Sequence, residues 1–289
     1  MNRFLFGLLM LLTTSLMGSS FAIGKIGLEY ISPLLLVGIR FSIAGILMAL
    51  LVIKKPLPNN LLDWGKIFIV GFFQTAGVMG CIFLSLRSIS AGETSILTFI
   101  NPLLVVILGT LFLRARYQLS QWFGVVIGFL GVIITLGFHL QLKFGIILGL
   151  GSAVSWSIST LIIKKWGKQF DIWVLTAYQM MFGGVLLLLM GITLEKPVLN
   201  LNPTSIFIIL WLAIMASIVQ FSGWFYLLNR GDPGKTSAFL FLAPLFGVLS
   251  GWIILGEVVK WYVYIGGALI FIGIFLVNWT FSNQKQNRF

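Results

Sequence analysis

The stretch that decides the fold is GETSILTFINPLLVVILGTLFL at residues 92–113, because it returns as GKTSAFLFLAPLFGVLSGWIIL at residues 234–255. Each copy is an apolar run of about 20 residues, the length that crosses the hydrocarbon core of a bilayer as an α-helix. Both copies place a glycine, a Thr-Ser pair and a proline at the same positions, and apolar composition alone does not produce such matches. The stretch therefore predicts a membrane-spanning helix within an internal repeat.

The composition of the whole chain agrees with a membrane protein. Only 9% of its 289 residues are charged and 59% are hydrophobic, whereas soluble domains carry roughly a quarter charged residues to keep their surfaces hydrated. This excludes an ordinary soluble globule. Continuous apolar runs also exclude a β-barrel, whose strands alternate polar and apolar residues.

Apolar runs bounded by charges, proline, glycine or helix-capping residues predict the spans. The predicted fold is an all-α membrane protein with ten transmembrane helices, at residues 4–23, 33–53, 66–86, 92–113, 120–138, 144–163, 172–192, 205–228, 235–255 and 259–279. The first run imitates a secretory signal peptide, but the repeat needs it as a helix.

The repeat divides the chain into two halves of five helices, residues 1–143 and 144–289. Residues 92–131 match residues 234–273 at a constant shift (234 − 92 = 142), and a second match (164 − 25 = 139) pairs Lys25 with Lys164 and Arg40 with Gln179. Because five is odd, the second half enters the membrane in the opposite sense. Such inverted repeats are typical of secondary transporters, with the substrate site near the midplane between the halves.

The charges predict an orientation and exclude several classes of function. The chain has 19 Lys and Arg against 7 Asp and Glu, and the basic residues sit almost wholly in loops. If the N-terminus is cytoplasmic, most of them fall on the cytoplasmic side, as the positive-inside rule requires. We therefore expect a multi-pass protein of the cell (cytoplasmic) membrane with both termini inside, and no nucleic-acid partner. With Cys81 and His139 each alone of its kind and no phosphate-binding loop, we expect no metal and no cofactor.

The order and spacing of several short motifs resemble the EamA-type family of the drug/metabolite transporter superfamily. These motifs are Gly18-Ser19-Ser20-Phe21 up to Lys25, Ser32-Pro33, Arg40 to Gly45, Ala238 to Pro244, and Leu255-Gly256-Glu257. The resemblance covers the whole chain and implies ten helices in two inverted repeats and, commonly, export of amino acids or related metabolites. One departure is that the first half has Arg114-Ala115-Arg116 where the family usually carries a glutamate matching Glu257.

Arg40 is the only charge predicted well inside a span, on the order of 10 Å from its end. An isolated arginine at this depth costs a few kcal/mol or more. Two interpretations stand. Arg40 faces a water-filled cavity and attracts a substrate carboxylate, or it is a structural arginine that snorkels or bonds to carbonyls.

Polar side chains on other spans complete the candidate substrate site. Ser152, Ser155, Trp156 and Ser159 recur at i, i+3, i+4 and i+7, which places them on one helical face. Such serines either bind a solute or allow close helix packing, and buried amides either line a cavity or cross-link helices. The predicted substrate-binding residues are Arg40, Trp156, Ser152, Ser155, Ser159, Gln74, Gln179, Asn101, Thr98 and Gln220.

Two prolines and two glutamates are further candidates. Pro102 and Pro244 each remove a helix hydrogen bond, so they are predicted hinges for gating or fixed bends. Glu93 lies at a membrane edge and is a candidate proton site. Glu257 is predicted to complement a helix dipole.

These features predict a secondary transporter that exports a small polar or amphipathic metabolite, such as an amino acid, by alternating access. The Ser, Cys and His residues form no nucleophile–base pair, so we expect no enzyme activity. The expected partners are a small-molecule substrate and the lipid bilayer, and a homodimer is left open. The alternative is a membrane scaffold or assembly subunit without transport activity.

Overall fold

The computed structural model describes residues 3–114, 117–135, 143–230 and 242–283. The regular structure of these residues is helical, apart from one isolated antiparallel bridge between Ile31 and Leu199, and short turns and loops connect the helices. The helices are α1 (Arg3–Gly27), α2 (Pro33–Leu51), α3 (Leu61–Gly71), η1 (Phe72–Gly77), α4 (Val78–Ser85), α5 (Ala91–Thr98), α6 (Asn101–Leu113), α7 (Leu119–Thr135), α8 (Phe144–Trp166), η2 (Gly167–Gln169), α9 (Ile172–Leu194), α10 (Pro203–Ala213), η3 (Ile214–Val219), α11 (Gln220–Arg230), α13 (Leu242–Leu255) and α14 (Trp261–Asn283).

These helices confirm the predicted all-α membrane fold. Seven helical segments of the described chain are long and apolar enough to cross a bilayer, and three shorter apolar helices, within α7, α13 and α14, account for the other spans. The start of the predicted span at residues 235–255 lies outside the described residues.

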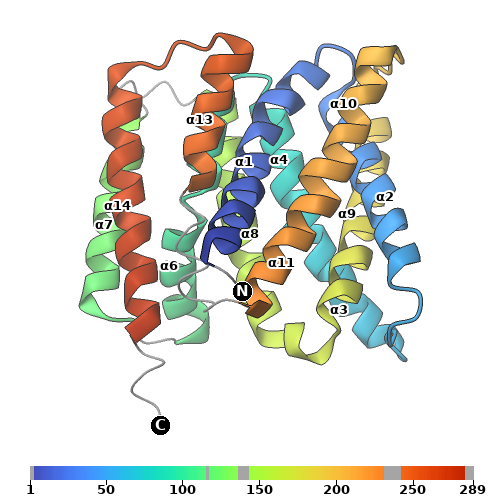
Figure 1. The fold of residues 1–289 in the computed structure, drawn as a ribbon, viewed down its shortest axis with the longest axis horizontal. Helices are drawn as coiled ribbons and strands as arrows, with labels where there is room; N and C mark the ends of the chain where they lie inside the picture. The colour runs from blue at the N-terminus through green and yellow to red at the C-terminus, as the bar shows by residue number, and fades with distance from the viewer. Residues whose placement is uncertain (1–2, 115–116, 136–142, 231–241, 284–289) are drawn as a thin grey trace.

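The bundle has two faces, which we name by the helix ends that they gather. At face 1, α1 and α9 end and α2 begins, as the hydrogen bond from Ser32 N to Val198 O shows. At face 2, α2 ends and α9 begins, because Lys55 Nζ lies 2.7 Å from Asp171 Oδ2. In Figure 1, face 1 is uppermost and face 2 is lowermost. Lys25 and Lys164 therefore lie at opposite faces, as an inverted repeat requires.

Two helix pairs, α2 with α9 and α7 with α14, join the halves by close packing of glycines. A Cβ on Gly45 would lie 2.5 Å from the backbone nitrogen of Met181, and one on Gly124 would lie 2.7 Å from the carbonyl oxygen of Gly273. Backbones approach this closely only where side chains are absent, which is how helices associate in lipid.

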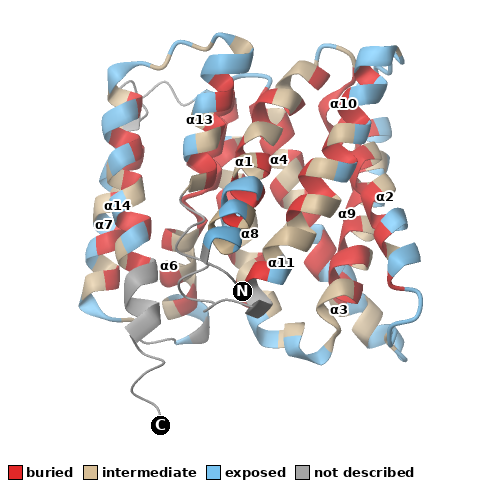
Figure 2. Ribbon diagram, in the orientation of Figure 1, coloured by how far each residue is buried: buried red, intermediate tan, exposed pale blue. Residues whose placement is uncertain are grey.

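Burial separates the interior of the bundle from its lipid-facing surface. Large apolar side chains such as Phe207 and Ile253 are 65% and 70% exposed, which suits contact with acyl chains. The buried positions face inward between the helices (Figure 2). The buried set includes polar residues, and these mark the interior site described next.

Three predicted spans depart from a regular α-helix. The predicted helices at 66–86 and 205–228 each contain a π-helical segment, η1 and η3, and these begin 142 residues apart (214 − 72 = 142). The predicted helix at 92–113 is broken between α5 and α6, with Pro102 in the first turn of α6. π-segments often occur at functional sites because they free backbone groups from the helical pattern.

Candidate substrate-binding cavity

A cavity of about 440 Å³ lies between the two halves of the bundle. Both repeats contribute to its wall, through α1, α2, α8, α9 and the spans that contain η1, η3 and the α5–α6 break. Predicted site residues in its lining are Arg40, Gln74, Thr98, Asn101, Pro102, Trp156, Gln179 and Gln220. The inverted fold thus brings together residues that are far apart in the sequence.

Arg40 lies on α2, lines this cavity and is 2% exposed. Its Nε donates to Ser217 Oγ at 2.9 Å and its Nη2 donates to the carbonyl of Ala216 at 2.7 Å. Both acceptors belong to the π-segment η3. The ring of Phe41 lies 4.7 Å from the guanidinium carbon. Arg40 therefore combines features of both interpretations, since it is anchored to the backbone and also faces the cavity.

The repeat partner of Arg40 makes the corresponding contact with the other π-segment. Gln179 on α9 accepts a hydrogen bond from Thr75 Oγ1 at 2.7 Å, and Thr75 lies 142 residues before Ser217 (217 − 75 = 142). In both halves, a polar side chain at corresponding positions bonds to a π-segment, but the side chain differs between the halves. The first half places a guanidinium at the cavity wall, and the second half places a neutral amide there.

The three predicted serines of α8 bond to neighbouring helices and are not part of the cavity lining. Ser152 Oγ lies 2.8 Å from Thr98 Oγ1, and Ser155 Oγ donates to the carbonyl of Phe73 at 2.9 Å. Ser159 Oγ donates to Gln74 Oε1 at 2.6 Å. These contacts match the packing interpretation of the serines, and they orient Thr98 and Gln74, which do line the cavity.

Aromatic rings form the apolar part of the wall. Trp156 packs edge-on against Phe99 with centroids 5.3 Å apart, and Phe99 lies 6.2 Å from Phe21. Such contacts add stability beyond the burial of area and hold the rings in place. The cavity therefore suits a solute with one apolar part and one polar part.

The lining of the cavity reaches close to face 2, whereas buried aromatic side chains bound it towards face 1. Near face 2 its wall includes Ile163, in the last turn of α8, and Ile172, the first residue of α9. Towards face 1 its wall includes Phe21, Phe83 and Phe99, which are all buried. A solute therefore has its shorter path to the cavity from face 2.

The remaining predicted residues lie near the ends of the helices. Glu93 forms a capping box with Ser90 at the N-terminus of α5 and is not among the cavity residues. Glu257 caps α5 as well, rather than its own helix, by accepting from Ala91 N at 2.9 Å. Pro244 is buried in the first turn of α13, and Leu240, whose carbonyl it was expected to free, lies outside the described residues.

Several cavity residues were not predicted as site residues. Ser20, Phe83, Thr160, Thr176 and Trp224 all line the cavity. The repeat does point to Ser20, because Ser20 pairs with Ser159 at the shift of 139 (159 − 20 = 139). The aromatic residues carried no such signal, since Phe and Trp are frequent on every span of this chain.

Comparison with known proteins identifies the family to which a chain with this cavity belongs. The EamA-like transporter family matches residues 5–137 and 143–279, once in each half and across nearly the whole chain. The chain belongs to the EamA-like transporter family. The membership agrees with the resemblance drawn from the motifs, and it makes the protein a multi-pass membrane transporter.

Individual relatives of this EamA-like protein support the same conclusion. An uncharacterized transporter of Archaeoglobus fulgidus is 30% identical over 92% of this chain and 96% of that protein. A probable amino-acid metabolite efflux pump of Salmonella typhimurium is 26% identical over 98% of this chain and 97% of that protein. A solved crystal structure superimposes with a TM-score of 0.68 at 19% identity, covering 99% of this chain and 100% of the other, which shows the shared fold.

Proposed function

We propose that this EamA-like protein exports a small amphipathic metabolite that carries a carboxylate, such as an amino acid, by alternating access. The observation that carries the proposal is the buried guanidinium of Arg40 at the wall of a cavity shared by the two halves. Secondary transporters with inverted repeats bind their substrates at this position.

The contacts of Arg40 support an anionic group as its ligand. An arginine has five N–H donors, and the contacts to Ser217 and Ala216 use one from Nε and one from Nη2. The other three are available for a planar acceptor, and a carboxylate accepts from this fork in a bidentate manner. No Asp or Glu is among the described residues that line the cavity. A cation alone would therefore lack an ionic partner and would be repelled by Arg40.

The rest of the wall suits the other parts of an amino acid or a related solute. Gln74, Asn101, Gln179 and Gln220 supply amide groups that accept from an ammonium group, and Trp156 packs against an apolar side chain. The cavity of about 440 Å³ falls in the range of small-molecule sites.

The distribution of basic residues supports an orientation with face 2 in the cytoplasm. Described residues at face 2 include Lys54, Lys55, Lys66, Arg114, Lys164, Lys165 and Lys168, against Lys25, Arg87, Lys143, Lys196 and Lys260 at face 1. By the positive-inside rule, this distribution supports a protein of the cytoplasmic membrane with both termini on the cytoplasmic side. In this orientation the cavity is reached from inside, as loading for export requires.

Purified protein in liposomes tests the proposal directly. Vesicles preloaded with an unlabelled amino acid should accumulate the labelled form by counterflow, and Arg40→Gln should abolish this accumulation while the protein remains folded. Esters of the same amino acids, which lack the carboxylate, should neither compete nor exchange. Absence of flux across a broad panel of metabolites would favour the scaffold alternative. An imposed pH gradient in the same vesicles tests Glu93 as the proton site, since Glu93→Gln should remove any acceleration by the gradient.

A further inference from the structure

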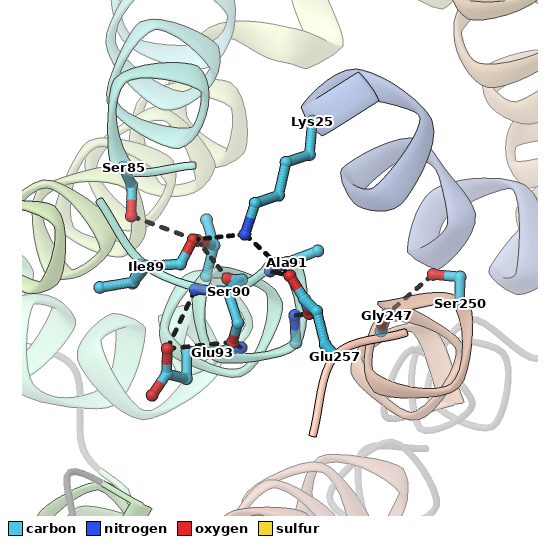
Figure 3. A network of polar contacts seen from close by, with 11 residues as sticks. Lys25, Ser85, Ile89, Ser90, Ala91, Glu93, Gly247, Ser250 and Glu257 are labelled. Carbon is cyan, nitrogen blue, oxygen red and sulfur yellow. Dashed lines mark hydrogen bonds and ion pairs between the residues drawn. The ribbon is translucent and has the colours of Figure 1, made fainter. Parts of the chain in front are cut away.

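A junction of three helix ends at face 1 joins the two halves through one ion pair. Lys25 Nζ, at the end of α1, lies 2.8 Å from Glu257 Oε1, which follows α13. Lys25 Nζ also donates to the carbonyl of Ile89 at 3.1 Å, just before α5. Figure 3 shows the ammonium group between that carbonyl and the carboxylate.

Glu257 binds the start of α5 in addition to Lys25. Its Oε1 accepts from Ala91 N at 2.9 Å, and its Oε2 lies 3.4 Å from Gly92 N. These amides belong to the first turn of α5, where the helix dipole favours a negative charge. The Glu257 side chain is only 15% exposed, so screening by solvent is limited. One carboxylate thus ties α13 of the second half to α1 and α5 of the first.

The junction spans the face-1 end of the cavity. α1 contributes Phe21 to the aromatic closure, and α5 leads directly into Phe99. α1 packs tightly on α13, since a Cβ on Gly18 would lie 2.5 Å from the carbonyl oxygen of Ala243. An opening of face 1 in which α5 moves away from the α1–α13 pair breaks the contacts of Glu257.

In the sequence, the positions that correspond to this junction in the other half carry different residues. At the shift of 142, Glu257 corresponds to Ala115 (257 − 142 = 115), which has no carboxylate. Ala91 corresponds to Pro233 (91 + 142 = 233), which has no backbone N–H to donate. Of the two residues of the ion pair, only the lysine has a counterpart of the same kind, because Lys25 corresponds to Lys164 at the shift of 139 (25 + 139 = 164). The two ends of an otherwise symmetric pathway therefore differ in chemistry.

We infer that the Lys25–Glu257 junction is a latch that holds face 1 closed and makes the face-2-open conformation the resting state of the transporter. This inference rests on the alternating access proposed above. It assigns Glu257 a role in conformational balance, through contacts that exist only while face 1 is closed. Removing the latch should shift the population towards the face-1-open state, because a two-state equilibrium follows the contacts that differ between its states.

Two cysteine reporters of similar depth measure this balance without a known substrate. In a Cys81→Ser background, Ser20→Cys reports access from face 1, and Thr160→Cys reports access from face 2, since both positions line the cavity. A membrane-impermeant maleimide is applied to right-side-out and to inside-out membrane vesicles. With the latch intact, Thr160→Cys should react quickly from face 2, and Ser20→Cys slowly from face 1.

Loss of the latch should move the two reporters in opposite directions. Glu257→Ala should raise labelling of Ser20→Cys from face 1 about tenfold, which corresponds to about 1.4 kcal/mol, and should lower labelling of Thr160→Cys. Glu257→Gln and Lys25→Met should have smaller effects in the same direction, because the glutamine still accepts from the α5 amides. Lys55→Met, which breaks the face-2 ion pair with Asp171, should not raise face-1 labelling and is the matched control.

Two results would overturn the latch. Unchanged labelling of Ser20→Cys in Glu257→Ala would show that the junction does not hold face 1 closed. Increased labelling of both reporters in Glu257→Ala would show that Glu257 maintains the fold and does not set the equilibrium between the two open states. Counterflow is measured on the parent protein and on Glu257→Ala without the reporter cysteines, so failure of the latch with transport intact is distinguished from failure of the proposed carrier function.

Discussion

Arg40 and Ser217 are 177 residues apart in the chain, yet they form a hydrogen bond of 2.9 Å at the cavity wall. Ser217 Oγ donates in turn to the carbonyl of Leu212 at 3.0 Å, inside a helix that has locally adopted π geometry. The serine therefore fixes the direction of the guanidinium. A residue of the second half therefore sets the position of Arg40, the one buried charged side chain among the described residues of the first half.

Removing this support should weaken binding without removing the charge. Ser217→Ala should raise the KM for carboxylate substrates about tenfold, because loss of one hydrogen bond to a charged group costs about 1.5 kcal/mol. Counterflow kinetics in liposomes measure the change. Thr14→Val is the matched control, since the Thr14 hydroxyl is buried but bonds only to carbonyls of its own helix. An equal rise in both variants would contradict a specific role for Ser217.

Arg40→Lys should also impair transport, although the charge is kept. A lysine ammonium lacks the planar fork, so it cannot hold Ser217, Ala216 and a carboxylate together. We expect at least about a tenfold loss of transport rate, with folded protein on size-exclusion chromatography. If Arg40→Lys transports as well as the parent, the bidentate contact is not required.

Trp156→Ala should weaken ligand binding through loss of the aromatic wall. The ring packs 5.3 Å from Phe99, and its removal leaves apolar ligands with less contact area. We expect about fivefold to tenfold weaker binding, which is measured as a smaller ligand-induced rise in Tm. Trp156→Phe should keep most of the affinity. Identical binding by the alanine variant would place the ligand elsewhere.

Gly45→Ala should destabilise the bundle where α2 meets α9. The added Cβ would lie 2.5 Å from the nitrogen and 2.7 Å from the Cα of Met181, so the helices must separate. We expect a loss of about 1–3 kcal/mol, seen as a lower Tm in detergent. Gly65→Ala is the control, because nothing lies within 4 Å of a Cβ there and alanine favours the helix.

Acid should weaken the contact between α2 and α9 at face 2. Burial opposes ionisation of Asp171, but hydrogen bonds from Lys55 and from the amides of Trp173 and Val174 outweigh it, and the pKa of the carboxyl falls below its usual value. A lowered folded-state pKa stabilises the protein above the unfolded-state pKa, and this is lost as pH falls through the folded value.

A variant isolates this contribution. At neutral pH, Asp171→Ala removes the helix cap and the ion pair together, so it should lower Tm. The loss in the free energy of unfolding should be about 1 kcal/mol, as is typical of a helix cap. The difference between parent and variant should shrink as the pH falls below about 4. A difference that stays constant down to about pH 3 would mean that ionisation of Asp171 does not contribute.

The amino-acid sequence by itself determined the class of fold. Apolar runs of span length can satisfy their backbone groups in lipid only as helices, so their number and limits followed from residues such as Ser32-Pro33. The shift of 142 predicted the repeat, and an odd number of spans predicted its inversion. Arg40 was singled out because a charge inside a span costs free energy whatever the neighbours of its helix are.

Only the tertiary structure decided which polar residues face the cavity. Ser155 and Gln74 were both predicted to bind substrate, yet Ser155 bonds to a neighbouring helix and Gln74 lines the cavity. The rotation of each helix about its axis depends on close packing at residues such as Gly45, and hydropathy does not encode it. The assembly of Lys25, Glu257 and the start of α5 likewise required the fold, because these groups meet only when the two halves pack.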